Sequence, residues 1–144
     1  MKKTVLIIAI PIVIILFSIC GLFITQKTTI RNIKKYNSQY EYYINKSIYG
    51  TELVTLINKV VNENEINKVE KDEKGFFIEN NENSIKINIK MNTNGKTYQM
   101  ETFYNNDITK FVENFNLVKF RCNKIEYHKK SGRVRKLYFE EILE

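Results

Sequence analysis

Few side chains in this sequence are of the types that perform catalysis, and their spacing does not bring a catalytic set together. The chain has one histidine, His128, and two cysteines, Cys20 and Cys122. On an extended strand Cys122 and His128 would share a face but lie about 20 Å apart at about 3.3 Å per residue. That is too far for a nucleophile and its base. Glu126 could pair with His128 on the same face, although a histidine beside a lysine-rich turn is more typical of a surface residue.

Metal, phosphate and cofactor sites find equally little support. Metal ligands come in sets of three or four nitrogen, sulfur or carboxylate groups at defined spacing. The five glycines are scattered, at positions 21, 50, 75, 95 and 132, so they form no phosphate-binding loop. Carboxylate pairs such as Glu63 and Glu65 stand in polar stretches, where solvation is the default. We therefore expect a protein without catalytic residues, cofactor or metal, and not an enzyme.

Positive charge near the C-terminus is the most specific binding feature of the sequence. Aromatic residues alternate with the basic ones there, as in hairpins that bind polyanions. The candidate contacts are Lys129, Lys130, Arg133, Arg135 and Lys136. The partner could be an anionic wall polymer or, less favoured, nucleic acid. The simplest interpretation is a solvated basic surface.

The strongest signal is a hydrophobic run at the start of the chain. Residues 5–24 are almost continuously apolar, and residues 4–26 carry no charge. Twenty helical residues span about 30 Å, the thickness of the hydrocarbon core of a bilayer. Lipid offers the backbone no hydrogen-bond partner, so the segment should be a helix that tolerates Pro11. The sequence predicts a membrane anchor over residues 1–26.

A cleaved signal peptide is the main alternative to an anchor. Ser18-Ile19-Cys20 before Gly21 is a tolerable cleavage sequence, but the apolar run continues through Ile24, beyond the usual length of about 7–15 residues. We therefore expect the anchor to be retained in the plasma membrane. The lysines and arginines on its two sides nearly balance or mildly favour a cytoplasmic C-terminus. A short basic tail before a single span is typical of a signal anchor, so we expect the domain outside the membrane.

Residues 27–49 continue a helical pattern and should form a juxtamembrane stalk. Its lysines and arginines would be attracted to anionic headgroups by about 1 kcal/mol each, and a stalk resting on the lipid is favoured over a specific lipid site. Five tyrosines lie between positions 36 and 49. Tyr36, Tyr40 and Tyr43 are candidates for a partner or glycan interface. They could equally form an aromatic belt or, as we favour, pack the stalk against the domain.

Residues 50–144 should form a small α+β domain, beginning with an amphipathic helix. Thr51 is the expected N-cap, and fraying is expected from Asn62 to Glu65. Apolar residues at helical spacing define its buried face, namely Leu53, Leu56, Ile57, Val60 and Val61. Farther on, Ile108, Phe111, Val112 and Phe115 predict a second helix, capped by Asn106 or Asp107.

Alternation of apolar and polar residues predicts the strands. Residues 85–91 alternate and are followed by Asn94-Gly95, the preferred pair for a two-residue hairpin turn. Counting outward pairs Met91 with Tyr98, and likewise Ile89 with Met100, Ile87 with Thr102 and Ile85 with Tyr104. Residues 76–78 are a candidate for a further short strand before this hairpin. Residues 118–128 and 133–141 should form a last hairpin, with a bulge between Cys122 and Ile125. The result is an antiparallel sheet with two helices on one face.

Two stretches, residues 36–43 and 50–59, resemble single-span membrane proteins of low-GC, clostridia-like bacteria. The resemblance extends loosely through residues 71–75 and 124–128. That group has no assigned activity, so the resemblance implies a bacterial membrane-anchored protein and no particular chemistry.

These observations favour a membrane-tethered, non-enzymatic interaction or structural domain of the bacterial cell envelope. Its expected partners are the lipid bilayer and either an envelope protein or an anionic polymer. A pilin-like subunit of a secretion or fibre system is the first alternative, although the leader motif of such subunits is missing. A polyanion-binding module that uses the basic hairpin is the second.

Overall fold

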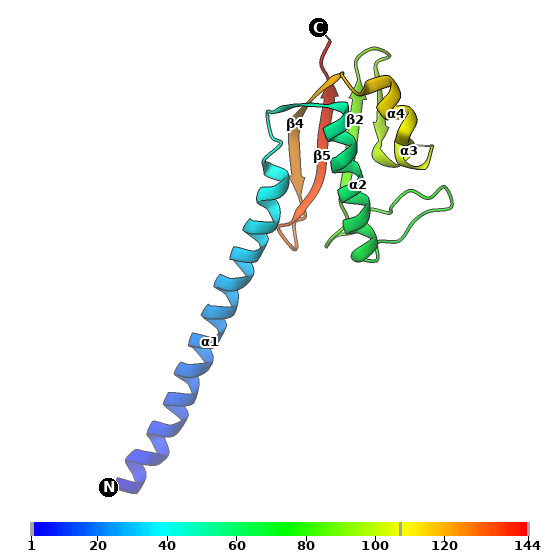
Figure 1. Cartoon of the computed structure of the whole chain (residues 1–144). Helices are drawn as coiled ribbons and strands as arrows, with labels where there is room; N and C mark the ends of the chain where they lie inside the picture. Colours follow the sequence, from blue (N-terminus) through cyan, green and yellow to red (C-terminus); the bar gives the residue numbers. More distant parts are fainter. Residues whose placement is uncertain (1, 107, 144) are drawn as a thin grey trace. The chain divides into compact units, whose positions relative to one another are not determined.

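The computed structural model describes residues 2–106 and 108–143, without the side chains of residues 2–10 and 12. The chain divides into two compact units, which meet between Tyr36 and Asn37. The first unit is helical, and the second holds the sheet (Figure 1).

Helix α1 runs from Lys2 to Glu41 and accommodates Pro11. Its large apolar side chains between Val13 and Ile24 are exposed, and the hydroxyl of Ser18 donates back to the carbonyl of Ile14 over 2.9 Å. Among the described residues, Val13–Glu41 is the one segment long and apolar enough to cross a membrane. The predicted apolar helix is confirmed.

The predicted stalk over residues 27–49 is wrong in its second half. Helix α1 ends at Glu41, and residues 37–41 already belong to the second unit. The Asn37 amide explains this, because it donates to Gly132 O over 2.8 Å and accepts from Val134 N over 3.0 Å. Ser47–Tyr49 then forms strand β1 at the edge of the sheet.

The sheet has five strands in the order β1-β4-β5-β2-β3. The other four strands are β2 (Lys86–Met91), β3 (Lys96–Gln99), β4 (Lys119–Tyr127) and β5 (Val134–Glu141). The last hairpin is confirmed as β4 and β5, with the register shift between Cys122 and Lys124. The expectation of a purely antiparallel sheet is wrong, because β2 pairs with β5 in parallel. The long connection between these two strands makes parallel pairing feasible.

Three helices of the second unit line one face of the sheet (Figure 1): α2 (Gly50–Ile66), α3 (Met100–Asn105) and α4 (Ile108–Phe115). The five predicted apolar residues of α2 are all buried. Ile87, Ile89 and Met91 supply the sheet side of the core, and Phe111 of α4 lies 5.9 Å from Phe120 between ring centroids. The α+β class is confirmed, with one helix more than predicted.

Helix α2 differs from its prediction at both ends. Tyr49 and not Thr51 is the N-cap, without a side-chain cap hydrogen bond. A Cβ at Gly50 would lie 2.0 Å from the carbonyl oxygen of Phe115, so this close approach needs glycine. The C-terminal end does not fray, because buried Asn64 donates to Ile85 O over 2.7 Å and accepts from Ile85 N over 2.8 Å.

The register predicted around Asn94-Gly95 is wrong by two residues. Met91 pairs with Lys96 and Ile89 with Tyr98, so four residues form the loop and Met100 begins α3. Only Gly95 of the pair has positive φ (69°). A residue far away in the sequence fixes the loop, because the Glu141 carboxylate accepts a hydrogen bond from the backbone N–H of Thr93 over 2.8 Å.

The prediction of the second helix is confirmed, whereas those of its cap and of a short strand over residues 76–78 are not. Helix α4 is confirmed, but Asp107 lies outside the described residues and the Asn106 amide donates backwards to Thr102 O. Residues 76–78 form no strand, only an isolated bridge between Lys71 and Phe77.

Asn64→Ala tests the link between α2 and the sheet. The variant leaves the buried N–H and C=O of Ile85 without partners, so we expect the free energy of unfolding to fall by about 2–4 kcal/mol. Chemical denaturation of the full chain in detergent, followed by circular dichroism, measures it. Asn62→Ala, at an exposed position of the same helix, is the matched control and should change the value by less than about 0.5 kcal/mol. Equal effects of the two variants would contradict the assignment.

Candidate binding face

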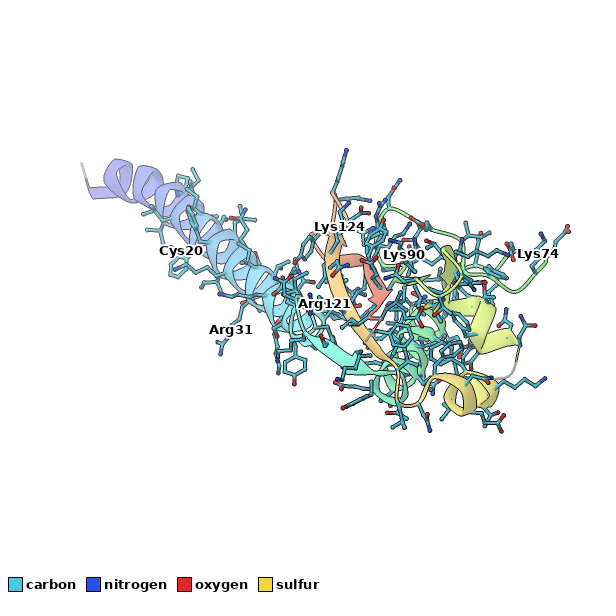
Figure 2. All side chains as sticks on the ribbon, turned by 90° about the horizontal axis from the view of Figure 1, so that it is seen from above. Cys20, Arg31, Lys74, Lys90, Arg121 and Lys124 are labelled. Carbon is cyan, nitrogen blue, oxygen red and sulfur yellow. The ribbon has the colours of Figure 1, made fainter. Side chains whose placement is uncertain are left out.

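The face of the sheet opposite the helices is open and polar, and we call it the open face. Figure 2 shows Lys90 and Lys124 on the side of the sheet away from α2 and α4. Strand alternation places further side chains there, namely Asn88, Thr97, Glu126, Lys136, Tyr138 and Glu140. Helices α2, α3 and α4 do not cover this face of the sheet (Figure 1).

Charges on the open face are paired with each other. Lys90 Nζ lies 2.6 Å from Glu140, and Glu126 accepts from both Lys124 and Arg135 at 2.7 Å. Exposed pairs of this kind contribute little to stability, about 0–1 kcal/mol each. Their effect is to cancel the positive charge of the strands locally.

The basic hairpin is partly neutralised in the same way. Lys130 pairs with Glu82, Lys136 pairs with Glu79, and Arg135 pairs with Glu126. Three of the five predicted contacts border a shared hollow of about 730 Å³, namely Lys129, Lys130 and Arg135. Arg133 and Lys136 do not line it. Polyanion binding stays a prediction, on a smaller electrostatic basis than the sequence indicated.

His128 is not the surface residue that the sequence indicated, because only 2% of it is exposed. Its Nε2 lies 2.7 Å from the carbonyl oxygen of Ser84, so Nε2 carries a proton and donates. Burial lowers the pKa of His128, and the charges of Arg135 and Arg133 add to this. The imidazole ties the hairpin to the preceding loop, a role that depends on a partner 44 residues away.

Cys122 is a small buried hydrophobe, as expected. It is completely buried, and burial raises the pKa of its thiol to about 11. A thiol with that pKa supplies almost no thiolate near neutral pH. Cys122 is therefore a packing residue and not a nucleophile.

The three tyrosine candidates for an interface differ in burial and in the unit to which they belong. Tyr40 is completely buried in the second unit, with Lys59 Nζ 5.0 Å from its ring centroid, so it packs the core and is not a contact for a partner. Tyr43 is half-buried, with its ring 6.4 Å from that of Phe139. Tyr36 belongs to the helical unit. The packing interpretation holds for Tyr40.

A buried ion pair is the feature that sequence reasoning missed. Alternation placed Lys86 on a polar face, yet its side chain is 5% exposed, and that of its partner Glu101 is 1% exposed. Lys86 Nζ donates to Glu101 Oε1 over 2.7 Å and to Gln99 over 3.3 Å. Glu101 Oε1 also accepts from Phe77 N, whereas its Oε2 has no hydrogen-bond partner among the described groups.

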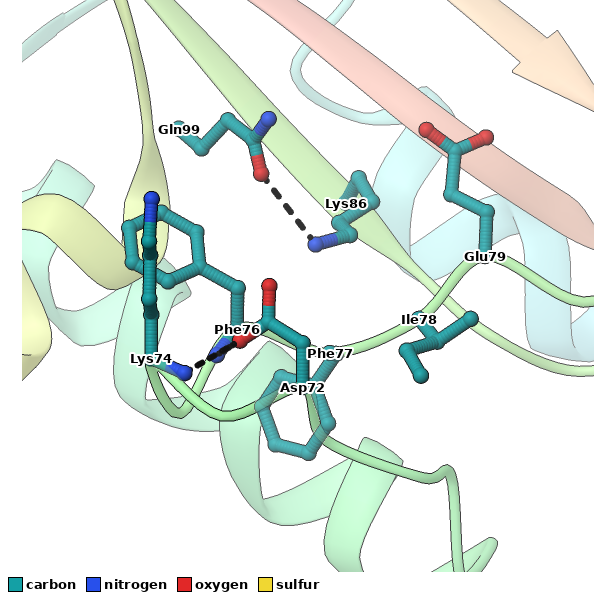
Figure 3. Close-up of a pocket in the computed structure, with 8 residues that line it drawn as sticks. All are labelled: Asp72, Lys74, Phe76, Phe77, Ile78, Glu79, Lys86 and Gln99. Carbon is teal, nitrogen blue, oxygen red and sulfur yellow. Dashed lines mark hydrogen bonds between the residues drawn. The ribbon is translucent and has the colours of Figure 1, made fainter.

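Lys86 forms part of a hollow of about 410 Å³ on the open face (Figure 3). Strand residues Lys86 and Gln99 line one side, and the loop that contains Phe76 and Ile78 lines the other. A second hollow of about 240 Å³ lies around Asn88 and Tyr138. The two are neighbours, because Asn88 and Gln99 are paired across β2 and β3. Their lining combines amide, ammonium and aromatic side chains.

Neither hollow brings a set of nucleophile, base and metal ligands together among the described residues. Within residues 2–106 and 108–143, no three His, Cys, Asp or Glu side chains lie close enough to hold a metal ion. His128 and Cys122 are both buried and engaged in packing. No family model, curated protein or solved structure matches the chain.

Lys86→Met tests the buried pair, because it leaves the Glu101 carboxylate buried without its counter-charge. We expect the free energy of unfolding to fall by about 3–5 kcal/mol. Adding Glu101→Gln should restore most of it, since the carboxamide still accepts from Phe77 N and carries no charge. Lys90→Met is the control: its pair is half-exposed and should cost at most about 1 kcal/mol. Failure of the double variant to recover stability would refute this account of the pair.

Glu126 should contribute to acid sensitivity. Hydrogen bonds from Lys124 and Arg135 lower its pKa from 4.5 to about 2. Because folding lowers this pKa, the ionised Glu126 carboxylate stabilises the folded state. This contribution is complete above pH 4.5 and disappears as the pH falls through 2. Glu126→Gln should therefore lower the unfolding free energy at pH 6, with the difference from wild type vanishing near pH 2. Denaturant midpoints across that range measure it, and a difference that grows on acidification would be the wrong sign. Glu113→Gln, at an exposed helical position, controls for the loss of one carboxylate.

Proposed function

We propose that this protein is a membrane-tethered, non-enzymatic binding domain of the bacterial cell envelope. The anchor is the N-terminal part of α1, retained in the plasma membrane, and residues 37–144 form the domain on its outer side. The observation that carries the proposal is the exposure of every large apolar side chain described between Val13 and Ile24.

Exposed apolar surface on this scale needs an apolar solvent. Burying one Leu, Ile or Phe side chain is worth about 1.5–3 kcal/mol, and exposed members of this class lie all around the helix, including Ile15, Phe17, Leu22 and Phe23. Hydroxyl groups in and just beyond the segment bond back to the helix itself, as Thr25 does to Leu22 O over 2.8 Å. Such internal bonding suits a lipid environment, which supplies no hydrogen bonds.

The second unit supports binding more than catalysis. Its hydrophobic core lies between the sheet and the helices. Its open face carries two adjacent hollows lined by amide, ammonium and aromatic side chains. Paired surface charges leave that face with little net field, which favours a partner recognised by shape and hydrogen bonding. An envelope protein fits this description better than a strong polyanion does.

A subunit of a fibre or secretion system is the second candidate. It is favoured by the continuity of α1, a 40-residue helix whose last turn belongs to the sheet domain. Such a subunit would assemble through its apolar segment, whereas a tethered domain remains dispersed in the bilayer. Crosslinking of membranes from the native host distinguishes a regular ladder of oligomers from a single species.

Thiol labelling of intact cells tests the anchor and the side of the membrane together. Lys129→Cys places a thiol at an exposed position of the hairpin. We expect an impermeant maleimide to label it in intact cells, and the protein to stay in the membrane fraction after alkaline carbonate extraction. The wild-type chain is the control, because Cys122 is buried and Cys20 would lie in lipid.

The two parts of this experiment fail separately. Labelling only after cell lysis would place the domain inside the cell and refute the orientation. Recovery in the soluble fraction would refute the anchor.

A further inference from the structure

Beyond its apolar segment, α1 carries a row of basic side chains that we call the basic stripe. It consists of Lys27, Arg31, Lys34 and Lys35, all exposed. They stand at helical positions i, i+4, i+7 and i+8, so they fall within an arc of about 100° on one face of the helix. Figure 2 shows Arg31 projecting from the helix on the domain side of Cys20 along the chain.

The basic stripe lies in a segment without acidic residues. Residues 2–40 contain no aspartate or glutamate, and the first carboxylate of the chain is Glu41. The stretch from Lys27 to Lys35 therefore carries a formal charge of +4 in sequence.

The stripe begins where the headgroups of a bilayer would begin. With Ile24 at the edge of the hydrocarbon, a rise of about 1.5 Å per residue places Lys27 about 5 Å and Arg31 about 10 Å beyond it. The headgroup layer is about 5–7 Å thick on each side. Long basic side chains reach back toward phosphate groups. Lys34 and Lys35 lie farther out, within about one Debye length of the headgroup surface.

We propose that the basic stripe binds the phosphate groups of anionic phospholipids, so that the helix gathers these lipids around it. The inference rests on the proposed membrane anchor and specifies its lipid partner. Each base at an anionic surface favours the anionic lipid by about fivefold, with Lys27 and Arg31 contributing most because they lie nearest the phosphates. The recognised group is the headgroup phosphate in the bilayer, not free phosphate.

Cys20 offers a native position from which to measure this preference. It is exposed on α1, whereas Cys122 is buried, so a fluorophore attached in detergent should label Cys20. Cys20 stands about 10 Å along the helix before Lys27, at the depth of the acyl chains below the stripe. Quenching by lipids with brominated chains therefore reports which lipids surround that side of the helix.

The test uses the labelled full chain in vesicles of phosphatidylcholine and phosphatidylglycerol at equal mole fractions, with one lipid or the other brominated. We expect several-fold greater relative quenching by brominated phosphatidylglycerol. Lys27→Gln with Arg31→Gln should abolish most of that preference, and 0.5 M salt should reduce it. Lys124→Gln with Lys129→Gln removes the same charge from the domain and should leave it unchanged.

Equal quenching by the two brominated lipids would overturn the lipid preference while the anchor stands. Absence of quenching by either lipid would refute the anchor, and with it the proposed function. Loss of the preference with millimolar inorganic phosphate, at constant ionic strength, would show a free-phosphate site and overturn the assignment to headgroups. If the helix variant and the domain variant lost the lipid preference equally, the preference would depend only on the net charge of the protein. That result would also contradict a binding site on the stripe.

Discussion

Exposing an apolar helix to water is costly, and the proposed location of the molecule depends on this constraint. From Val13 to Ile24 the large apolar side chains of α1 are exposed and are not buried against the other described residues. A bilayer would remove this cost, and the back-bonded hydroxyl groups of Ser18 and Thr25 are compatible with it. The second unit has its own core, so the proposed tether would supply a location and is not needed for the packing of the sheet and helices.

Charge is treated in three different ways along the chain. The basic stripe lies in a stretch of sequence without acidic residues, the charges of the open face are paired at the surface, and that of Lys86 is paired in the interior. The first arrangement favours a distant anionic surface, and the second leaves the face close to neutral. The third costs desolvation and fixes β2 to the start of α3. A tethered binding domain can use all three.

The parts of the fold that local pattern controls were predictable. The buried face of α2, the alternation of β2 and the bulge after Cys122 follow from periodicity and composition. The errors have distant causes, such as the bond from Thr93 to Glu141, which changes the hairpin register. Lys86 is buried where its partner Glu101, 15 residues later in the chain, and the loop before β2 meet. Such contacts leave no periodic signal, so the candidate face could not be read from the sequence.

Amide hydrogen exchange of the full chain in lipid nanodiscs tests the central claim most directly. If α1 spans the bilayer, the amides of residues 13–24 should remain protected for hours, while those of residues 27–35 exchange far sooner. Lipid is then the source of protection, because no protein surface covers the first segment. Rapid exchange across both segments, at rates seen in detergent-free buffer, would contradict a transmembrane helix.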